Sequence, residues 1–234
     1  MVHERCTTMY RSLQVVGTFA GRIDGKPLTL RPTPQRILAL LSVTGELSRQ
    51  DAARLLWPDV HQARALANLR NALWRLREDG PGFVAEDSGI LNLQDVDVDL
   101  HEHRRWMRSA LTNDLPFQPV LSNGSYEILP GWDEDWLIQP REEFTLLSLY
   151  AFEAAGKQCL DAGRSSEAAH LALSALGIDP LRETANRLLI EVHLRDGNHC
   201  AAVRQLRKYE NLLSQELGTR PSNELCTIVG SWRG

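Results

Sequence analysis

The sequence of 234 residues predicts a mainly α-helical protein with a small β part, arranged in two domains. Three observations support this prediction. Residues 1–97 combine short β-type segments with three helical patterns, the pattern of residues 98–234 is almost wholly helical, and a spacing of 34 residues recurs in that second part. At the usual ~150 residues per domain, the length fits one large or two modest domains whose cores need neither disulfides nor metals.

The chain begins with a predicted sheet and a first helix. Residues 13–30 are rich in β-branched and apolar residues, and Asp24-Gly25 is typical of a tight hairpin turn, so we expect a small antiparallel sheet. Thr33-Pro34 can open a helix, because the first turn tolerates proline, and Gly45 is expected to end it.

Two more helices and a second hairpin complete the first domain. Ser48 can cap a second helix, and a third is expected over Gln62–Glu78. Residues 83–86 and 90–93 then flank a short turn and are expected to pair as a hairpin. The order of sheet, three helices and hairpin predicts a winged helix-turn-helix domain over residues 1–97.

Residues 98–234 contain the repeated helical pattern. Gly163-Arg164 and Gly197-Asn198 lie 34 residues apart, and so do Ala168 and Ala202, each in an amphipathic helix. This period is typical of tetratricopeptide helix hairpins. We therefore expect an all-α tetratricopeptide-like domain, whose stacked hairpins commonly present a binding surface.

Charge is distributed unevenly along the chain, although the net charge is only −4. Residues 1–77 hold 12 Lys and Arg against 5 Asp and Glu, residues 78–143 hold 4 against 15, and residues 144–234 hold 10 of each. A basic first third favours a polyanion as partner, whereas the acidic middle favours solvent or a basic protein surface.

The third predicted helix carries the candidate base-reading residues. At ~100° per residue its leucines share one face, which we predict to be buried; they are Leu66, Leu69, Leu73 and Leu76. The candidates lie nearly opposite: Arg64, Asn68, Asn71 and Arg75. Arg can bridge O6 and N7 of guanine, and Asn can bridge N6 and N7 of adenine. Residues 62–77 hold four arginines, two asparagines and no acidic residue, which favours DNA binding over a merely solvated face.

Three further arginines are candidate contacts to DNA phosphates: Arg36, Arg70 and Arg77. Arg70 and Arg77 lie at the edge of the leucine face, where they are better placed for the DNA backbone than for bases. The predicted wing is less favourable, because its tip is Glu86-Asp87-Ser88 and insertion into the minor groove usually needs Arg or Lys. We therefore prefer a hairpin that only completes the fold.

No metal, cofactor or catalytic site is expected. The acidic residues of Asp95–Asp99 lack the Gly and Glu that an EF-hand loop requires further on. His101 and His103 are two residues apart, unlike a zinc-binding pair on one helix face, and are expected at the surface. The four cysteines form no CxxC pair, and nucleotide-binding or hydrolase motifs are absent, so we do not expect an enzyme.

Seven short motifs occur in order along the chain: Gln35–Leu41, Leu56–Pro58, Leu73–Arg77, Val96–Leu100, Leu129–Trp136, Asp179–Glu183 and Glu216–Ser222. Together they resemble the antibiotic regulatory protein class of bacterial transcriptional activators. That class joins a response-regulator-type winged helix to a bacterial transcriptional activation domain built from tetratricopeptide-like helices. The resemblance implies binding to direct-repeat promoter sites as a homodimer, and recruitment of RNA polymerase.

The sequence is compatible with two functions. In the first, the protein is a sequence-specific transcriptional regulator that binds double-stranded DNA; in the second, it is an adaptor whose helical domain binds a protein and whose winged helix no longer reads DNA. The basic first third and the acid-free helix face favour the regulator. No apolar run approaches the ~18 to 20 residues of a membrane span, and the N-terminus has no signal-peptide pattern, so we expect a cytoplasmic protein without a membrane partner.

Overall fold

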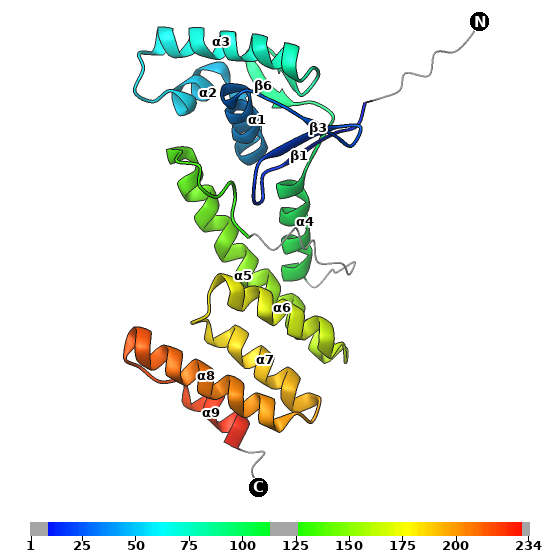
Figure 1. The fold of residues 1–234 in the computed structure, drawn as a ribbon, viewed down its shortest axis with the longest axis vertical. Helices are drawn as coiled ribbons and strands as arrows, with labels where there is room; N and C mark the ends of the chain where they lie inside the picture. The colour runs from blue at the N-terminus through cyan, green and yellow to red at the C-terminus, as the bar shows by residue number, and fades with distance from the viewer. Residues whose placement is uncertain (1–8, 113–125, 231–234) are drawn as a thin grey trace, which may run out of the picture. The chain divides into compact units, whose positions relative to one another are not determined.

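The computed structural model describes residues 9–112 and 126–230 of the chain (Figure 1). The described elements follow the predicted order, with a small β part mixed with helices first and helices alone afterwards. Contacts divide these residues into two compact units. One contains the residues up to Arg104 and those from Tyr126 to Phe144, and the other contains Arg105–Thr112 and the residues from Thr145 onward. The predicted fold class is confirmed.

The N-terminal sheet has four strands in the order β3-β2-β1-β7. β1 (Arg11–Gln14), β2 (Ala20–Ile23) and β3 (Lys26–Leu28) form the predicted antiparallel part, with Asp24-Gly25 at positive φ in the turn. β7 (Val96–Val98) pairs with β1 in parallel. The sheet is therefore mixed rather than purely antiparallel, because the chain returns to it after the second hairpin.

Three helices follow the first strands, namely α1 (Pro32–Thr44), α2 (Arg49–Leu56) and α3 (Gln62–Asp79). The predicted helix signals act as expected. Gly45 ends α1 at a φ of 80°, a conformation that glycine adopts without a steric penalty. The Ser48 hydroxyl caps α2 by accepting the Asp51 backbone N–H at 3.1 Å.

The second hairpin consists of β5 (Val84–Asp87) and β6 (Ile90–Leu93), and β4 (Leu47–Ser48) pairs with its β6 edge. Ser88 and Gly89 both take positive φ angles, 51° and 80°, as a tight hairpin turn requires. The hairpin therefore stands where the wing of a winged helix-turn-helix is expected.

The segment that follows residue 125 packs with the N-terminal unit. The Leu129 N–H donates to the Val15 carbonyl at 2.9 Å, and the Gly17 N–H donates to the Glu127 carbonyl at 2.8 Å. The segment then enters a short 3-10 helix, η1 (Asp135–Leu137). The sequence predicts one domain boundary after residue 97. The contacts of Glu127 and Leu129 instead join this later segment to the first strands, and no local sequence pattern connects the two.

The first turn of α4 (Asp99–Thr112) is attached to the sheet. The Asp99 carboxylate accepts the N–H groups of Val15 at 2.8 Å and Val16 at 3.1 Å. Burial raises the pKa of Asp99, and these hydrogen bonds oppose the rise. His103 is 2% exposed, and its Nδ1 lies 2.8 Å from the Asp99 carbonyl oxygen, so the expectation of a surface residue was wrong.

The C-terminal unit is built from helix hairpins. It contains the part of α4 from Arg105 onward and the part of α5 (Ile138–Asp161) from Thr145 onward. The helices that follow are α6 (Ser165–Ile178), α7 (Glu183–Arg195), α8 (His199–Leu217) and α9 (Asn223–Gly230). The 34-residue spacing is visible in the turns. Arg164 donates its N–H to the Cys159 carbonyl after Gly163, and Asn198 donates to His193 after Gly197, both at 2.8 Å. The two glycines have positive φ angles of 75° and 70°.

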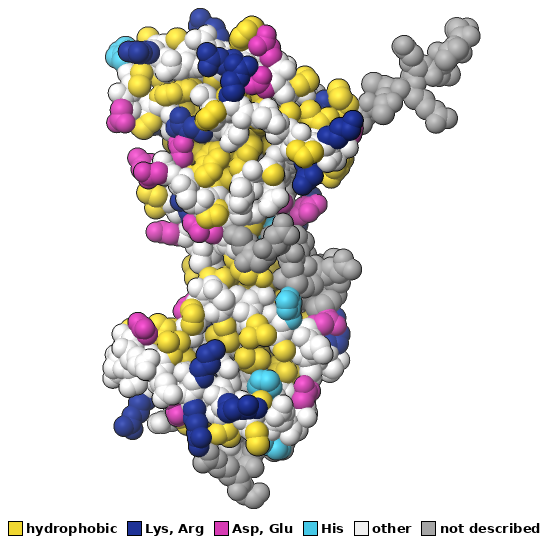
Figure 2. All heavy atoms as spheres, viewed as in Figure 1, with side chains coloured by type: hydrophobic (Ala, Val, Ile, Leu, Met, Phe, Trp, Pro, Cys, Tyr) yellow, Lys and Arg dark blue, Asp and Glu magenta, His cyan; other side chains and the backbone are white. Residues whose placement is uncertain are grey.

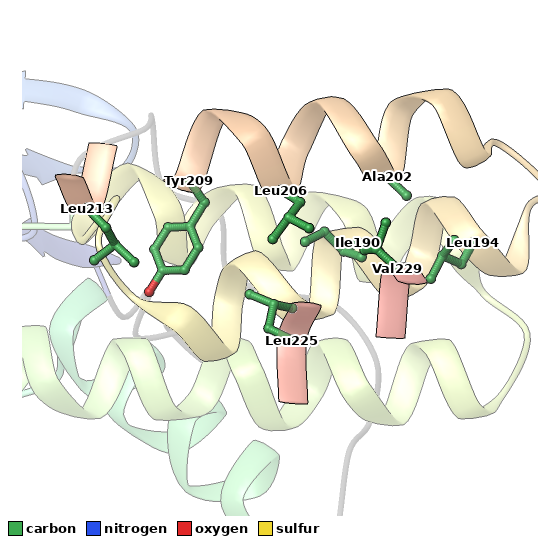
Figure 3. Close-up of a cluster of buried hydrophobic side chains, with 8 residues drawn as sticks. All are labelled: Ile190, Leu194, Ala202, Leu206, Tyr209, Leu213, Leu225 and Val229. Carbon is green, nitrogen blue, oxygen red and sulfur yellow. The ribbon is translucent and has the colours of Figure 1, made fainter. Parts of the chain in front are cut away.

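Apolar side chains from α7, α8 and α9 form a continuous core in this unit (Figure 3). The core residues are Ile190, Leu194, Ala202, Leu206, Tyr209, Leu213, Leu225 and Val229. Close helix packing also requires Gly156 in α5, because a Cβ atom there would lie 2.4 Å from the Leu188 side chain. The absence of a side chain at Gly156 therefore lets α5 lie close to α7.

Candidate nucleic-acid interface

The outward face of α3 carries the candidate DNA contacts. Figure 2 shows basic side chains gathered over this helix. The exposed candidates are Arg64, Arg70, Asn71, Arg75 and Arg77, and Asn68 is half-buried. The structure therefore brings both predicted groups, the base-reading and the phosphate-contacting residues of α3, to one helix surface.

The side chains of the six polar candidates on α3 form no hydrogen bond or ion pair with other described residues. Arg75 nevertheless acts at longer range on Asp79, at the end of the helix. The pKa of Asp79 is lowered mainly by its hydrogen bonds with Arg31, and Arg75 adds to this effect. The other charges of the α3 face remain available to an external partner, since no acidic side chain within the described ranges pairs with them at close range.

The buried face of α3 is rotated from the predicted one. Ala65 and Ala72 are 2% and 3% exposed and pack inward, while Leu66 is only half-buried. Alanine permits close approach of neighbouring elements, so these two positions define the packing as much as the leucines do. The rotation moves the centre of the outward face toward Asn71 and Trp74 at ~100° per residue.

Trp74 is a residue that the sequence analysis did not select. Its side chain is 59% exposed, which is unusual for a large aromatic residue outside a binding surface. Around the helix axis, the Trp74 side chain lies between two pairs of arginines. Arg64 and Arg75 are on one side of it, and Arg70 and Arg77 are on the other. Its position five residues after the buried Leu69 was a sufficient signal, because five residues rotate the side chain by ~500° to the outer half of the helix.

Arg36 serves the interior of the N-terminal unit. Its guanidinium pairs with both carboxylate oxygens of Glu134, and its Nη2 also donates to the Leu56 carbonyl at 2.7 Å. Trp136 donates its indole N–H to Glu134 at 2.9 Å. Because these partners use the Nε and Nη2 donors of Arg36 and Glu134 balances its charge, we withdraw Arg36 from the candidate phosphate contacts. Its links join three of the motifs on which the resemblance depends.

The hairpin after α3 presents an acidic tip. Glu86 is bound by Arg49 at the start of α2 at 2.7 Å, while Asp87 and Ser88 are exposed. The Arg49–Glu86 pair attaches the hairpin to α2. This structural role agrees with the interpretation that the hairpin completes the fold and does not insert into the minor groove. Within the described ranges, no three His, Cys, Asp or Glu side chains lie together as metal ligands would.

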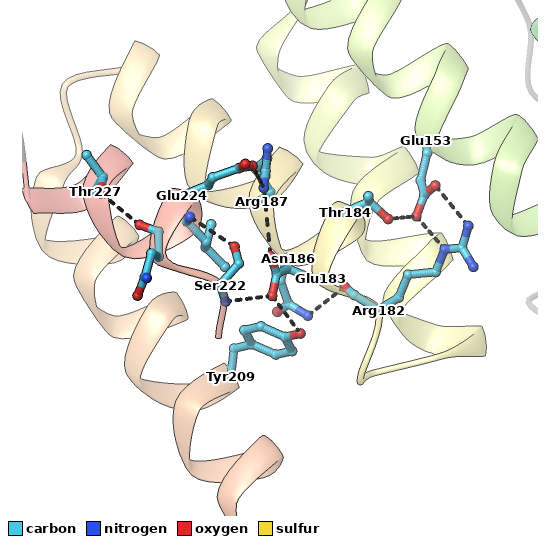
Figure 4. A network of polar contacts seen from close by, with 12 residues as sticks. Glu153, Arg182, Glu183, Thr184, Asn186, Arg187, Tyr209, Ser222, Glu224 and Thr227 are labelled. Atoms are coloured by element: carbon cyan, nitrogen blue, oxygen red, sulfur yellow. Dashed lines mark hydrogen bonds and ion pairs between the residues drawn. The ribbon is translucent and has the colours of Figure 1, made fainter. Parts of the chain in front are cut away.

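Two other motifs meet in the C-terminal unit (Figure 4). Glu183 accepts the Ser222 N–H at 3.0 Å, and the Tyr209 hydroxyl donates to Leu181 at 3.2 Å and to Glu183 at 3.5 Å. Burial raises the pKa of Tyr209 to about 12, and the Glu183 carboxylate adds to the rise. The residues of these motifs therefore hold the fold together.

The comparisons with known proteins agree with this architecture. Residues 119–229 match the family model of the bacterial transcriptional activator domain, a little less than half of the chain. The match supports a bacterial transcriptional activator, and the family is one of regulators rather than of enzymes.

A solved structure, Mycobacterium tuberculosis EmbR in complex with a low affinity phosphopeptide, is similar with a TM-score of 0.68. The two sequences are 18% identical, and the likeness covers 95% of this chain and 64% of that chain. At this identity it shows the fold alone. No curated protein matches the chain by sequence.

Among the helices of residues 9–112 and 126–230, none combines the length and the apolar character needed to cross a bilayer.

Proposed function

We propose that the protein is a cytoplasmic, sequence-specific DNA-binding transcriptional activator that binds direct-repeat promoter sites as a homodimer and recruits RNA polymerase. The observation that supports DNA binding most directly is the outward face of α3. It presents arginine and asparagine side chains without partners among the described residues, and residues 62–77 contain no acidic side chain. Such a face complements the phosphates and base edges of a major groove.

The candidates divide by role. Arg64, Asn68, Asn71 and Arg75 are proposed to read bases, whereas Arg70 and Arg77 are proposed to contact phosphates. Trp74 lies between the two groups, where its ring could pack on a thymine methyl group or on the sugar backbone. Trp74→Ala is therefore expected to weaken DNA binding without a large loss of stability, since the side chain is mostly exposed.

The salt dependence of DNA binding tests this proposal. Affinity should fall steeply with salt, because each phosphate that an arginine neutralises contributes about −0.9 to the log–log slope. Arg70→Ala and Arg77→Ala should each make the slope shallower, with little change in sequence preference. Arg207→Ala, which removes an exposed arginine of α8, is the matched control and should leave the slope unchanged.

The adaptor is the second candidate function. It is favoured by the helical unit, whose family match and stacked hairpins are compatible with protein binding. A slope near zero on promoter DNA, in protein that remains folded, would favour the adaptor over the activator. A steep slope that Arg70→Ala and Arg77→Ala reduce would favour the activator.

A further inference from the structure

A groove of about 440 Å³ runs between α5 and α7 in the C-terminal unit. Its lining comes from α5 (Tyr150, Glu153, Ala154 and Lys157), from α7 (Thr184, Arg187, Leu188 and Glu191) and from Leu111 of α4. Each of the four α5 residues lies 34 positions before one of the four α7 residues. The groove therefore presents equivalent positions of two successive repeats next to each other.

The charges in the middle of the groove are already paired within the chain (Figure 4). Glu153 binds Arg182 at 2.6 Å, and Arg187 binds Glu224 at 3.3 Å. Lys157 and Glu191, by contrast, have no hydrogen bond or ion pair with another residue in the described part of the chain. Burial raises the pKa of Glu191, and the charges of Arg187, Lys157 and Arg195 in the same unit oppose the rise without forming an ion pair with it.

Apolar side chains accompany these two charges. Leu111 and Tyr150 line the groove and are 47% and 48% exposed. Leu146 is 49% exposed and lies one turn before Tyr150 on α5, so the two share a helix face. Large apolar residues that are exposed together mark a surface for protein association more often than a solvated face.

We propose that this groove is a contact surface for a second copy of the chain, related by a twofold axis so that Lys157 of each copy pairs with Glu191 of the other. The proposal rests on the proposed function, in which the protein acts as a dimer, and names the dimer surface. A twofold interface uses the same patch on both copies and must therefore be complementary to itself. Lys157 and Glu191 meet this requirement, because they occupy equivalent repeat positions with opposite charge.

The arrangement also explains why the occupant is a second copy. A strongly acidic or basic partner would meet one favourable and one unfavourable charge in the groove. A second copy turned through the twofold axis adds an opposite charge beside both Lys157 and Glu191, which within one chain act on each other only at longer range, and it covers Leu111, Leu146 and Tyr150 with the same apolar residues. A stable dimer buries ~800 Å² of accessible surface on each partner. The groove would therefore form the centre of a wider interface.

The test uses charge reversal in the full chain. Lys157→Glu and Glu191→Lys should each weaken self-association at least tenfold at low salt, because each variant places like charges opposite each other in its own dimer. An equimolar mixture of the two variants should recover association as a mixed dimer, in which both pairs are again of opposite charge. Sedimentation equilibrium gives the affinities, and native mass spectrometry with one tagged copy identifies the mixed species.

Lys208→Glu makes the same charge change at an exposed position of α8 and should leave self-association unchanged. Mixing is decisive, because it cannot repair a defect within one chain. The proposal is overturned if the wild-type chain stays monomeric at micromolar concentration, if the single variants associate as well as the wild type, or if the folded variants fail to associate when mixed.

Salt-dependent DNA binding separates this proposal from the proposed function. If the chain binds DNA but the mixed variants do not associate, only the dimer surface is wrong. If the mixed dimer forms but neither the wild type nor the variants bind DNA, the surface is supported and DNA binding is contradicted.

Discussion

The arginines of α3 and the arginines inside the two units show the same side chain in two different situations. Arg36 and Arg182 each hold a carboxylate, and Arg141 donates to the carbonyls of Ile128 at 2.7 Å and Trp132 at 3.0 Å. The arginines of α3 have no such partner in the described residues. The difference teaches that an arginine is available to DNA only where the fold leaves its donors unused.

The largest expected effect concerns stability and comes from Arg36. Arg36→Ala should lower the free energy of unfolding by roughly 2 to 3 kcal/mol, because Glu134, with a side chain only 13% exposed, would keep its charge without its main partner. Denaturant unfolding followed by circular dichroism measures this loss. Arg70→Ala is the matched control and should change stability by less than about 0.5 kcal/mol, because its side chain is exposed.

Equal losses for Arg36→Ala and Arg70→Ala would contradict the distinction between paired and available arginines. A loss of DNA affinity in Arg36→Ala that persists where the protein is fully folded would restore Arg36 as a phosphate contact.

The next effect concerns DNA binding. Asn71→Ala and Arg75→Ala should each weaken binding to the cognate site by roughly 1 to 3 kcal/mol and change binding to random DNA less, because only the cognate bases lose a bidentate contact. Stability should stay close to that of the wild type, since both side chains are exposed. The ratio of cognate to random affinity, measured at one salt concentration, checks the prediction. An unchanged ratio in both folded variants would exclude these two residues as base readers.

Much of the fold was predictable because its signals are local. Asp24-Gly25, Gly45 and Ser48 determine the backbone at their own positions, and Gly163 and Gly197 repeat the same helix end 34 residues apart. The parallel pairing of β7 with β1 and the attachment of Ile128 to the N-terminal unit were not predictable in this way. They depend on contacts between segments that are far apart in sequence.

The same limit applies to the candidate site. The helical period predicted which residues of α3 lie outside, with an error in rotation caused by Ala65 and Ala72. It could not show that Arg36 is occupied, because its partner Glu134 lies 98 positions further along the chain. Trp74 could have been found from the period alone.

A smaller effect is expected for Tyr209, inside the polar network of the C-terminal unit. Its pKa is about 12 in the folded protein against an ordinary value of 10, so the unfolded chain loses this proton first as pH rises. Stability should therefore fall between pH 10 and 12, by on the order of 1 kcal/mol at pH 11. Tyr209→Phe should flatten this part of the pH profile and cost about 1 kcal/mol at neutral pH through its lost hydrogen bonds. Identical alkaline profiles for the two proteins would contradict the assigned role of Tyr209.

The smallest effect is expected for Arg54, which is paired and yet exposed. Arg54 binds Asp51 at 3.0 Å across three residues of α2, but the two side chains are 75% and 48% exposed. Water and salt screen such a pair, so Arg54→Ala should change the free energy of unfolding by less than about 0.5 kcal/mol. The same denaturant measurement at low and high salt checks this value and separates the effect of burial from the effect of pairing. A loss as large as that of Arg36→Ala would mean that pairing alone decides the role of an arginine. If Arg54→Ala instead made the salt dependence of DNA binding shallower, its weak internal pair would not prevent Arg54 from contacting phosphate, and the available surface would extend from α3 onto α2.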